Sequence, residues 1–197
     1  MRFKFFGIEI YISFLFFGVI TVMLATDKTG FALPCVTAIV FHECGHLFMM
    51  WLRECAPKSI KLIPASVQIT ASFSRDYKTD ILVAIFGPLV NLVIFGALYY
   101  NYMCFKNVTV LCFALVNLAV AVFNLLPVKG LDGGTILLSF LCKRYDINKA
   151  TLLLRFTTFI LAVGIIVTAV MFSYKGKTNV SFYIIGIYLL VISIMKM

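Results

Sequence analysis

Long apolar stretches follow one another along almost the whole chain, separated by short polar or charged connections. The six longest cover residues 8–26, 31–52, 79–101, 107–127, 153–173 and 179–195. At ~1.5 Å of helix rise per residue, each is long enough to cross about 30 Å of hydrocarbon. The pattern predicts an all-α membrane protein with about six transmembrane helices, and it assigns residues 1–197 to a single polytopic membrane domain.

Two shorter segments depart from this pattern. Around Pro64, apolar residues fall at alternating positions, and this period of two predicts a short β-hairpin at residues 59–73. An interfacial loop explains the same residues equally well. Further along, Pro127 and three glycines interrupt the apolar run that ends near Leu126. These residues predict a broken or re-entrant segment around residues 124–142, which at membrane depth must be buried in protein or line a wet cavity.

The composition strengthens the membrane interpretation. Hydrophobic residues make up 62% of the chain and the mean hydropathy is +1.05. Both values are well above those of a soluble domain with a single core. The net charge is +9, but the basic residues are scattered over the connections, which argues against nucleic acid as a partner. With six spans, only Lys28, Lys106, Lys175 and Lys177 of the 17 basic residues fall on or near one side of the bilayer. The positive-inside rule therefore predicts cytoplasmic N- and C-termini, in what we expect to be a bacterial cell membrane.

The chain has two histidines, and they lie four positions apart in the second apolar stretch. On a helix this spacing places His42 and His46 on one face, where both imidazoles can bind one metal ion. Glu43 follows the first histidine, as in the H-E-x-x-H arrangement of zinc proteases, in which the glutamate acts as general base and acid. Two histidines in a helix core are the alternative. Ionisable residues at membrane depth cost about 2.5 to 3.5 kcal/mol each on insertion scales, which disfavours that alternative.

A catalytic zinc usually takes three protein ligands, so a third must come from elsewhere in the chain. The sequence has no third histidine, and the acidic residues other than Glu43 and Asp132 are adequately explained as solvated carboxylates at predicted membrane edges or among cytoplasmic charges. Asp132 follows Pro127 and Gly130 within the interrupted segment, and the glycines after it would allow close approach to the metal-binding helix. A cytoplasmic turn with an Asp-Gly signal is the alternative interpretation of Asp132.

Three motifs together resemble the site-2 protease family of intramembrane zinc metalloproteases. Residues 42–46 match its H-E-x-x-H, residues 124–134 match its N-P-x-P-x-x-x-L-D-G-G element, and residues 87–91 resemble its Gly-Pro-x-x-Asn. The amino-acid sequence of residues 124–134 is most similar to that of the sporulation branch, whose members process membrane-tethered sigma factor precursors. Leu125 replaces the first proline of that element.

The resemblance implies zinc as the cofactor, His42, His46 and Asp132 as its ligands, Glu43 as catalytic base and acid, and Asn124 near the substrate or oxyanion. A neutral amide can donate to an oxyanion without adding a buried charge, although Asn124 could equally cap broken backbone. Asn91 is predicted to make a polar contact between helices near a Gly-Pro kink.

These features predict an intramembrane zinc endopeptidase that hydrolyses a peptide bond of a transmembrane or membrane-tethered protein near the cytoplasmic face. A sigma or transcription factor precursor is a candidate substrate, and the lipid bilayer and a regulatory membrane protein are the other expected partners. The alternatives are a membrane metal transporter and a non-catalytic scaffold that uses the same metal site. The chain offers a single ligand set and retains Glu43, which disfavours both.

Overall fold

The computed structural model describes residues 2–5, 8–55, 57–63, 66–71, 76–174 and 180–194. They form two compact units, Met1–Asn124 and Leu125–Met197. The predicted helical character is confirmed, and each of the six apolar stretches contains a helix. The grouping of residues 1–197 into one membrane domain stays a prediction.

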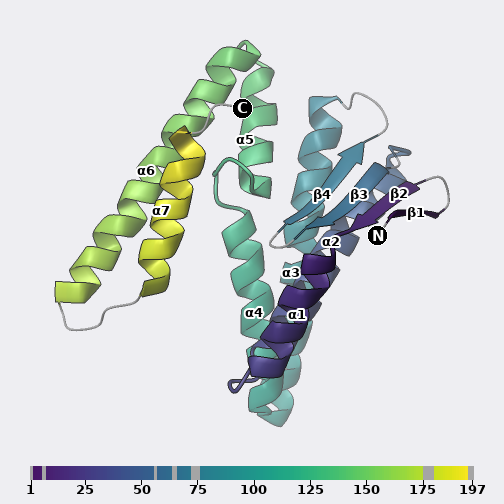
Figure 1. The fold of residues 1–197 in the computed structure, drawn as a ribbon, viewed down its shortest axis with the longest axis vertical. Helices are drawn as coiled ribbons and strands as arrows, with labels where there is room; N and C mark the ends of the chain where they lie inside the picture. The colour runs from purple at the N-terminus through teal and green to yellow at the C-terminus, as the bar shows by residue number, and fades with distance from the viewer. Residues whose placement is uncertain are drawn as a thin grey trace. The chain divides into compact units, whose positions relative to one another are not determined.

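The first unit combines four strands with four helices among its described residues (Figure 1). The strands are β1 (Arg2–Phe5), β2 (Ile8–Ile12), β3 (Pro57–Ile63) and β4 (Ser66–Ala71), and the helices are α1 (Phe14–Thr26), α2 (Ala32–Leu52), α3 (Tyr77–Phe105) and α4 (Val108–Asn124).

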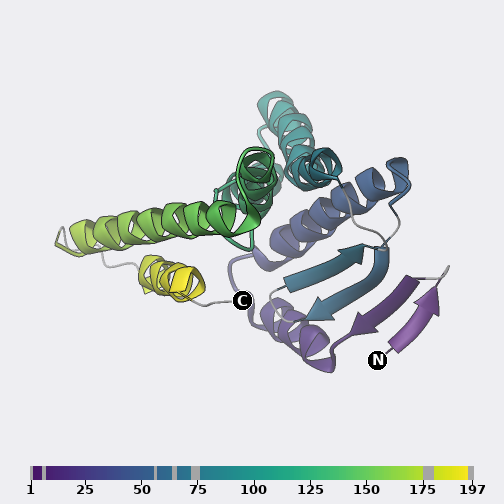
Figure 2. The same cartoon turned by 90° about the horizontal axis from the view of Figure 1, so that it is seen from above.

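The strands form one sheet in the order β1-β2-β3-β4, and Figure 2 shows them side by side. β1 and β2 pair antiparallel, β2 and β3 pair parallel, and β3 and β4 pair antiparallel. The parallel pair requires a long crossover, which α1 and α2 provide. The hairpin expected at residues 59–73 falls on β3 and β4, which pair from Pro57 to Ala71; residues 64–65 and 72–73 lie outside the described residues.

The N-terminal strands were not predicted, and the first expected span was wrong in its first five residues. Residues 8–12 form β2, and α1 begins only at Phe14. The sequence Ile8-Glu9-Ile10-Tyr11-Ile12 alternates isoleucine with larger or charged residues, a pattern that favours a strand. The long apolar run that follows conceals this short pattern when hydropathy is averaged over a window long enough for a span.

Small residues allow α2, α3 and α4 to pack closely in the first unit. Ala38 on α2 and Ala114 on α4 are fully buried, and Gly45 faces the backbone of Phe86 and Gly87 on α3. Small side chains at helix contacts are typical of membrane bundles, where close backbone approach maximises van der Waals contact.

Two carboxylates accept hydrogen bonds from backbone N–H groups at the starts of α2 and α3. Asp27 precedes α2 and accepts hydrogen bonds from the backbone N–H groups of Ala32 at 2.7 Å and Thr29 at 2.8 Å. These bonds, together with that from the Thr29 hydroxyl, lower the pKa of Asp27 to about 2. Asp76 caps α3 by accepting from the Thr79 N–H at 2.8 Å, and the hydrogen bonds from Thr79 lower its pKa.

The second unit contains α5 (Asp132–Cys142), α6 (Ile147–Tyr174) and α7 (Val180–Ile194). α6 packs against both α5 and α7, around the buried side chains of Val128, Ala162 and Leu189. The predicted break is present, because α4 ends at Asn124 and α5 begins at Asp132, with turns and irregular backbone between them. Gly130 there has φ +94°, a left-handed conformation that favours glycine.

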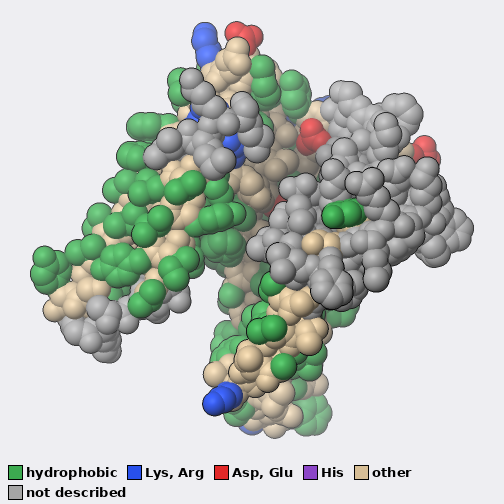
Figure 3. All heavy atoms as spheres, in the orientation of Figure 1, with side chains coloured by type: hydrophobic (Ala, Val, Ile, Leu, Met, Phe, Trp, Pro, Cys, Tyr) green, Lys and Arg blue, Asp and Glu red, His purple; other side chains and the backbone are tan. Residues whose placement is uncertain are grey.

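Three described helices, α2, α3 and α6, are long and apolar enough to cross a membrane. Shorter apolar helices occupy Val108–Asn124, Asp132–Cys142 and Tyr183–Ser193. Large apolar side chains cover much of the helix surface in Figure 3, as expected where lipid is the solvent. A total of six spans stays a prediction.

Candidate metal centre

Both histidines lie on the buried face of α2. His42 is 5% exposed and His46 is 8% exposed, and their Nε2 atoms are 3.1 Å apart. One helical turn separates the two residues, so both rings lie on the same face of α2, where they pack edge to face at an interplanar angle of 87° and direct their Nε2 atoms toward each other. The helix therefore presents two imidazole nitrogens as a pair.

The other nitrogen of each ring is held by an acceptor. The His46 Nδ1–H donates to the Val83 carbonyl oxygen at 2.8 Å, and the His42 Nδ1–H donates to the Asn91 Oδ1 at 2.9 Å. A carbonyl oxygen can only accept, so in the neutral rings the proton lies on Nδ1 and the Nε2 atom carries the lone pair. This is the tautomer that a histidine needs to bind a metal through Nε2, with a backbone or side-chain oxygen orienting the ring.

The paired nitrogens fit a metal ion. Two lone pairs that face each other at 3.1 Å repel unless a cation or a proton lies between them. Nitrogens at ~2.0 to 2.1 Å from a tetrahedral zinc would lie about 3.4 Å apart, close to the observed separation. His42 and His46 thus offer two of the ligands that a zinc site requires.

Gly87 on α3 leaves the space that the imidazoles occupy. A Cβ atom at Gly87 would collide with Cε1 and Nε2 of His46 and would lie 3.0 Å from Cε1 of His42. Pro88 follows within the helix and lacks the N–H that would bond to the Ala84 carbonyl. This break in the hydrogen-bond ladder lies beside the turn whose Val83 carbonyl accepts from His46.

Asn91 joins three helices behind His42. It is fully buried, and its Nδ2 donates to the Ala38 carbonyl at 3.0 Å and to the Asn117 Oδ1 at 2.9 Å. Both bonds use the amide nitrogen, so the amide oxygen is the atom directed at His42. The predicted contact between helices is therefore present, and the same side chain also orients a candidate metal ligand.

Asn117 holds Asn91 in place and was missed in the sequence analysis. It is 2% exposed, and its Nδ2 donates to the Phe113 carbonyl of α4 at 2.8 Å. A signal for it exists, because Asn117 is a lone amide in the middle of an apolar helix, where polar residues are costly and usually functional. The Val83 carbonyl had no such signal, since it is a backbone group on a residue with an apolar side chain.

Glu43 follows His42 on α2 and is half-buried. At 100° per residue around the helix, its side chain leaves α2 beside the pair of imidazoles instead of between them. Cys44, the next residue, is exposed. Neither the position of Glu43 nor that of Cys44 interferes with the two converging nitrogens.

Asp132 begins α5 in the second unit and is half-buried. Gly133 and Gly134 follow it, and a Cβ atom at either would collide with backbone carbonyls, those of Leu125 and Leu126 for Gly133 and that of Val128 for Gly134. The two glycines therefore allow the first turn of α5 to fold back onto the chain that precedes it. This packing fixes the backbone that carries Asp132 within its own unit.

Asn124 is the last residue of α4, and its Nδ2 donates to the Val120 carbonyl at 3.0 Å. The bond returns to the carbonyl one turn earlier on the same helix, the local i to i−4 contact that a short polar side chain makes with its own helix backbone. One of its two N–H groups is sufficient for this bond.

Comparisons with known proteins agree on one family. The model of Peptidase family M50 matches residues 103–171. A zinc metalloprotease of Methanocaldococcus jannaschii is 29% identical over 164 residues, which are 76% of this chain and 47% of the relative. Stage IV sporulation protein FB of Bacillus subtilis is 30% identical over 124 residues, which are 60% of this chain and 43% of the relative. The chain thus spans less than half the length of these relatives.

The fold is similar to that of a solved structure. The site-2 protease from Methanocaldococcus jannaschii superposes with a TM-score of 0.70 and 22% sequence identity, covering 98% of this chain and 93% of that chain.

Proposed function

Because these matches confirm the resemblance to the site-2 protease family, we propose that the chain is an intramembrane zinc endopeptidase. The observation that carries the proposal is the pair of Nε2 atoms 3.1 Å apart, each ring oriented through its Nδ1 by an oxygen acceptor. The three apolar helices and the family make the chain an integral membrane protein. Peptide hydrolysis explains why such a polar cluster is maintained on an apolar helix.

Zinc would be held by His42, His46 and Asp132, with Asp132 as the third ligand. When bound, it would act as a Lewis acid that polarises the carbonyl of the scissile peptide bond. The role of the two histidines as ligands is supported by their tautomers. The role of Asp132 is supported by the family motif and by its place at the start of α5, where Gly133 and Gly134 allow close backbone packing.

Glu43 would act as general base and then as general acid. Its carboxylate takes a proton from the attacking water as the new carbon–oxygen bond forms, and gives it to the amine nitrogen as the carbon–nitrogen bond breaks. Asn124 would donate its second amide N–H to the oxyanion that develops on the carbonyl oxygen. Its bond to the Val120 carbonyl would keep the amide oriented during this step.

The substrate would be a transmembrane or membrane-tethered protein, held in extended form by the β3–β4 hairpin. β4 ends the order of the sheet, so one of its edges has no strand partner among the described residues. Strand addition at such an edge binds main chain to main chain and tolerates varied side chains. An extended segment also exposes the amide that must be cut.

We further propose a cytoplasmic location for both termini and for the cut, in a bacterial cell membrane. The similarity to a sporulation protein favours a membrane-tethered sigma or transcription factor precursor as the substrate, with a regulatory membrane protein as a further partner.

Substitution of the general base provides the test. Glu43→Gln, co-expressed with a membrane-tethered transcription factor precursor, should reduce cleavage on immunoblots by at least about 100-fold, a typical contribution of general acid–base catalysis. Zinc measured in the purified protein should stay at the wild-type level. Glu54→Gln, the same change beyond the end of α2, is the matched control and should cleave normally. Equal processing by wild type and Glu43→Gln would reject the role of Glu43.

A further inference from the structure

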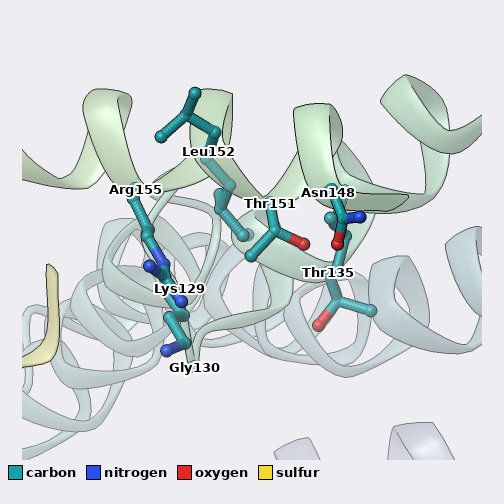
Figure 4. Close-up of a pocket in the computed structure, with 10 residues that line it drawn as sticks. Lys129, Gly130, Thr135, Asn148, Thr151, Leu152 and Arg155 are labelled. Atoms are coloured by element: carbon teal, nitrogen blue, oxygen red, sulfur yellow. The ribbon is translucent and has the colours of Figure 1, made fainter. Parts of the chain in front are cut away.

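A cavity of about 590 Å³ opens between α5, α6 and the turn before α5, all within the second unit. Five polar or charged side chains contribute to its lining: Lys129, Thr135, Asn148, Thr151 and Arg155. Figure 4 shows the Arg155 side chain extending from α6 toward the turn that carries Lys129 and Gly130. The cavity has the size of a small-ligand site and combines two cations with hydroxyl and amide groups.

Hydrogen bonds to α6 hold the turn that brings the two cations together. The Lys129 N–H donates to the Oγ1 of Thr158 at 3.0 Å, and Thr158 is fully buried. One residue earlier on α6, the Thr157 hydroxyl shares its proton between the Leu154 carbonyl at 2.8 Å and the Pro127 carbonyl at 3.3 Å. The packing of the turn on α6 therefore places Lys129 at the cavity that Arg155 lines.

Arg155 has an unused donor. Its Nε atom is buried, and no described residue accepts a hydrogen bond from it. A buried donor without an acceptor is destabilising, and a ligand oxygen in the cavity would remove that cost. The guanidinium group offers several N–H donors in one plane, which suits the oxygens of a phosphate.

The surrounding charge also favours an anion. Residues 125–174 contain five basic residues, Lys129, Lys143, Arg144, Lys149 and Arg155, against the acidic residues Asp132 and Asp146. Figure 3 shows basic side chains at the end of this unit where α5 and α6 connect. Several cations at one end of a membrane helix attract anionic lipid.

We propose that this cavity, independently of the proteolytic activity, binds the phosphate headgroup of an anionic phospholipid. Arg155 lies two residues inside the apolar stretch 153–173, where a long basic side chain reaches the headgroup level. Leu152 and Phe156 flank it on α6 and are 67% and 62% exposed, an apolar surface for the acyl chains. Free phosphate would use the cations alone, whereas a phospholipid uses both surfaces.

Titration of the purified full chain in a neutral detergent tests the proposal. Dihexanoyl phosphatidylglycerol is added, and native mass spectrometry measures the bound fraction. Phosphatidylglycerol should bind at least about fivefold tighter than the zwitterionic dihexanoyl phosphatidylcholine, and Arg155→Gln and Lys129→Gln should each weaken it about fivefold, the typical worth of one basic residue at an anionic surface. Lys149→Gln is the matched control, because Lys149 is exposed on the same helix and does not line this cavity, so that at about 0.15 M salt its charge is screened from the bound headgroup and Kd should change less than about twofold.

Three outcomes would overturn the proposal: equal affinity for the two lipids, equal weakening by Lys149→Gln and Arg155→Gln, or displacement of the lipid by inorganic phosphate at an equal concentration. The first two would indicate diffuse attraction, and the third a site for free phosphate. The melting temperature of each lipid-free variant checks its folding. Arg155→Lys retains the charge but lacks the planar set of N–H donors, so it should bind phosphatidylglycerol more weakly than the wild type and more tightly than Arg155→Gln. Lys129→Gln tests the cavity even if Arg155→Gln does not fold.

Discussion

Gly87 controls how closely α3 approaches the imidazoles of α2. Gly87→Ala adds a methyl group that collides with the His46 ring, and overpacking of this kind typically costs about 1 to 3 kcal/mol. Displacement of the ring would separate the paired nitrogens, so we expect zinc affinity to fall by about tenfold or more, as each 1.4 kcal/mol is a factor of ten. Competition with a metal chelator, followed by metal analysis of the purified protein, measures this affinity.

Gly96→Ala is the matched control on the same helix. A Cβ atom at Gly96 meets nothing within 4 Å, so this variant should bind zinc as the wild type does. It should also stabilise α3 slightly, because alanine is the better helix former. If both variants kept wild-type affinity, Gly87 would not be the residue that makes room for the metal-binding rings.

Asn91 acts on the candidate metal site through His42. Asn91→Leu removes the oxygen that accepts from the His42 Nδ1–H, and loss of such an orienting acceptor typically costs about 10- to 100-fold in metal affinity. We expect a reduction in this range in the same chelator competition. Asn101→Leu, at an exposed position of α3, should leave the affinity unchanged. A variant of Asn91 that lost abundance but retained its zinc affinity would reduce Asn91 to a contact between helices.

Among the elements, β4 has the most specific proposed role. Successive N–H groups of an edge strand point alternately toward the neighbouring strand and away from it. Of the adjacent residues Gln68 and Ile69, one therefore donates toward β3 and the other toward the open edge. Proline at the outward position spares the pairing with β3 but removes a donor from the edge that would bind substrate.

Cleavage and abundance separate the two proline variants. Of Gln68→Pro and Ile69→Pro, we expect one to reach wild-type abundance and to cleave the membrane-tethered precursor several-fold less, and the other to lose abundance. Immunoblots of protease and substrate from the same cells give both readouts. If the abundant variant cleaved the precursor normally, the β3–β4 hairpin would not be the element that holds the substrate in extended form.

Local sequence patterns predict some of the helices and strands, and long-range contacts determine the others. α2 and its histidine pair follow from local spacing, because residues four apart on a helix face the same side whatever surrounds them. The break after Asn124 follows from Pro127 and the glycines, whose backbone preferences are also local. The parallel pairing of β2 with β3 depends on a contact between residues about 50 positions apart, such as Ile10 and Ile60, which no local pattern encodes. The hydrogen bond between Asn91 and Asn117 depends in the same way on how α3 and α4 pack.

At the scale of the whole molecule, the distribution of basic residues predicts which loops face the cytoplasm. The connection between α3 and α4, at Lys106 and Asn107, is short and carries one of the few charges expected outside. The connection between α5 and α6 carries Lys143 and Arg144 and is expected inside, as is the C-terminus.

Fusions to alkaline phosphatase, which is active only outside the cytoplasm, distinguish these two sides. A fusion after Asn107 should be active, and fusions after Arg144 and after Met197 should be inactive although they accumulate. An active fusion at Met197 would invert the proposed orientation. The proposed cut and the proposed lipid site would then have to be assigned to the opposite leaflet, because their assignment to the cytoplasmic side rests on these same charges.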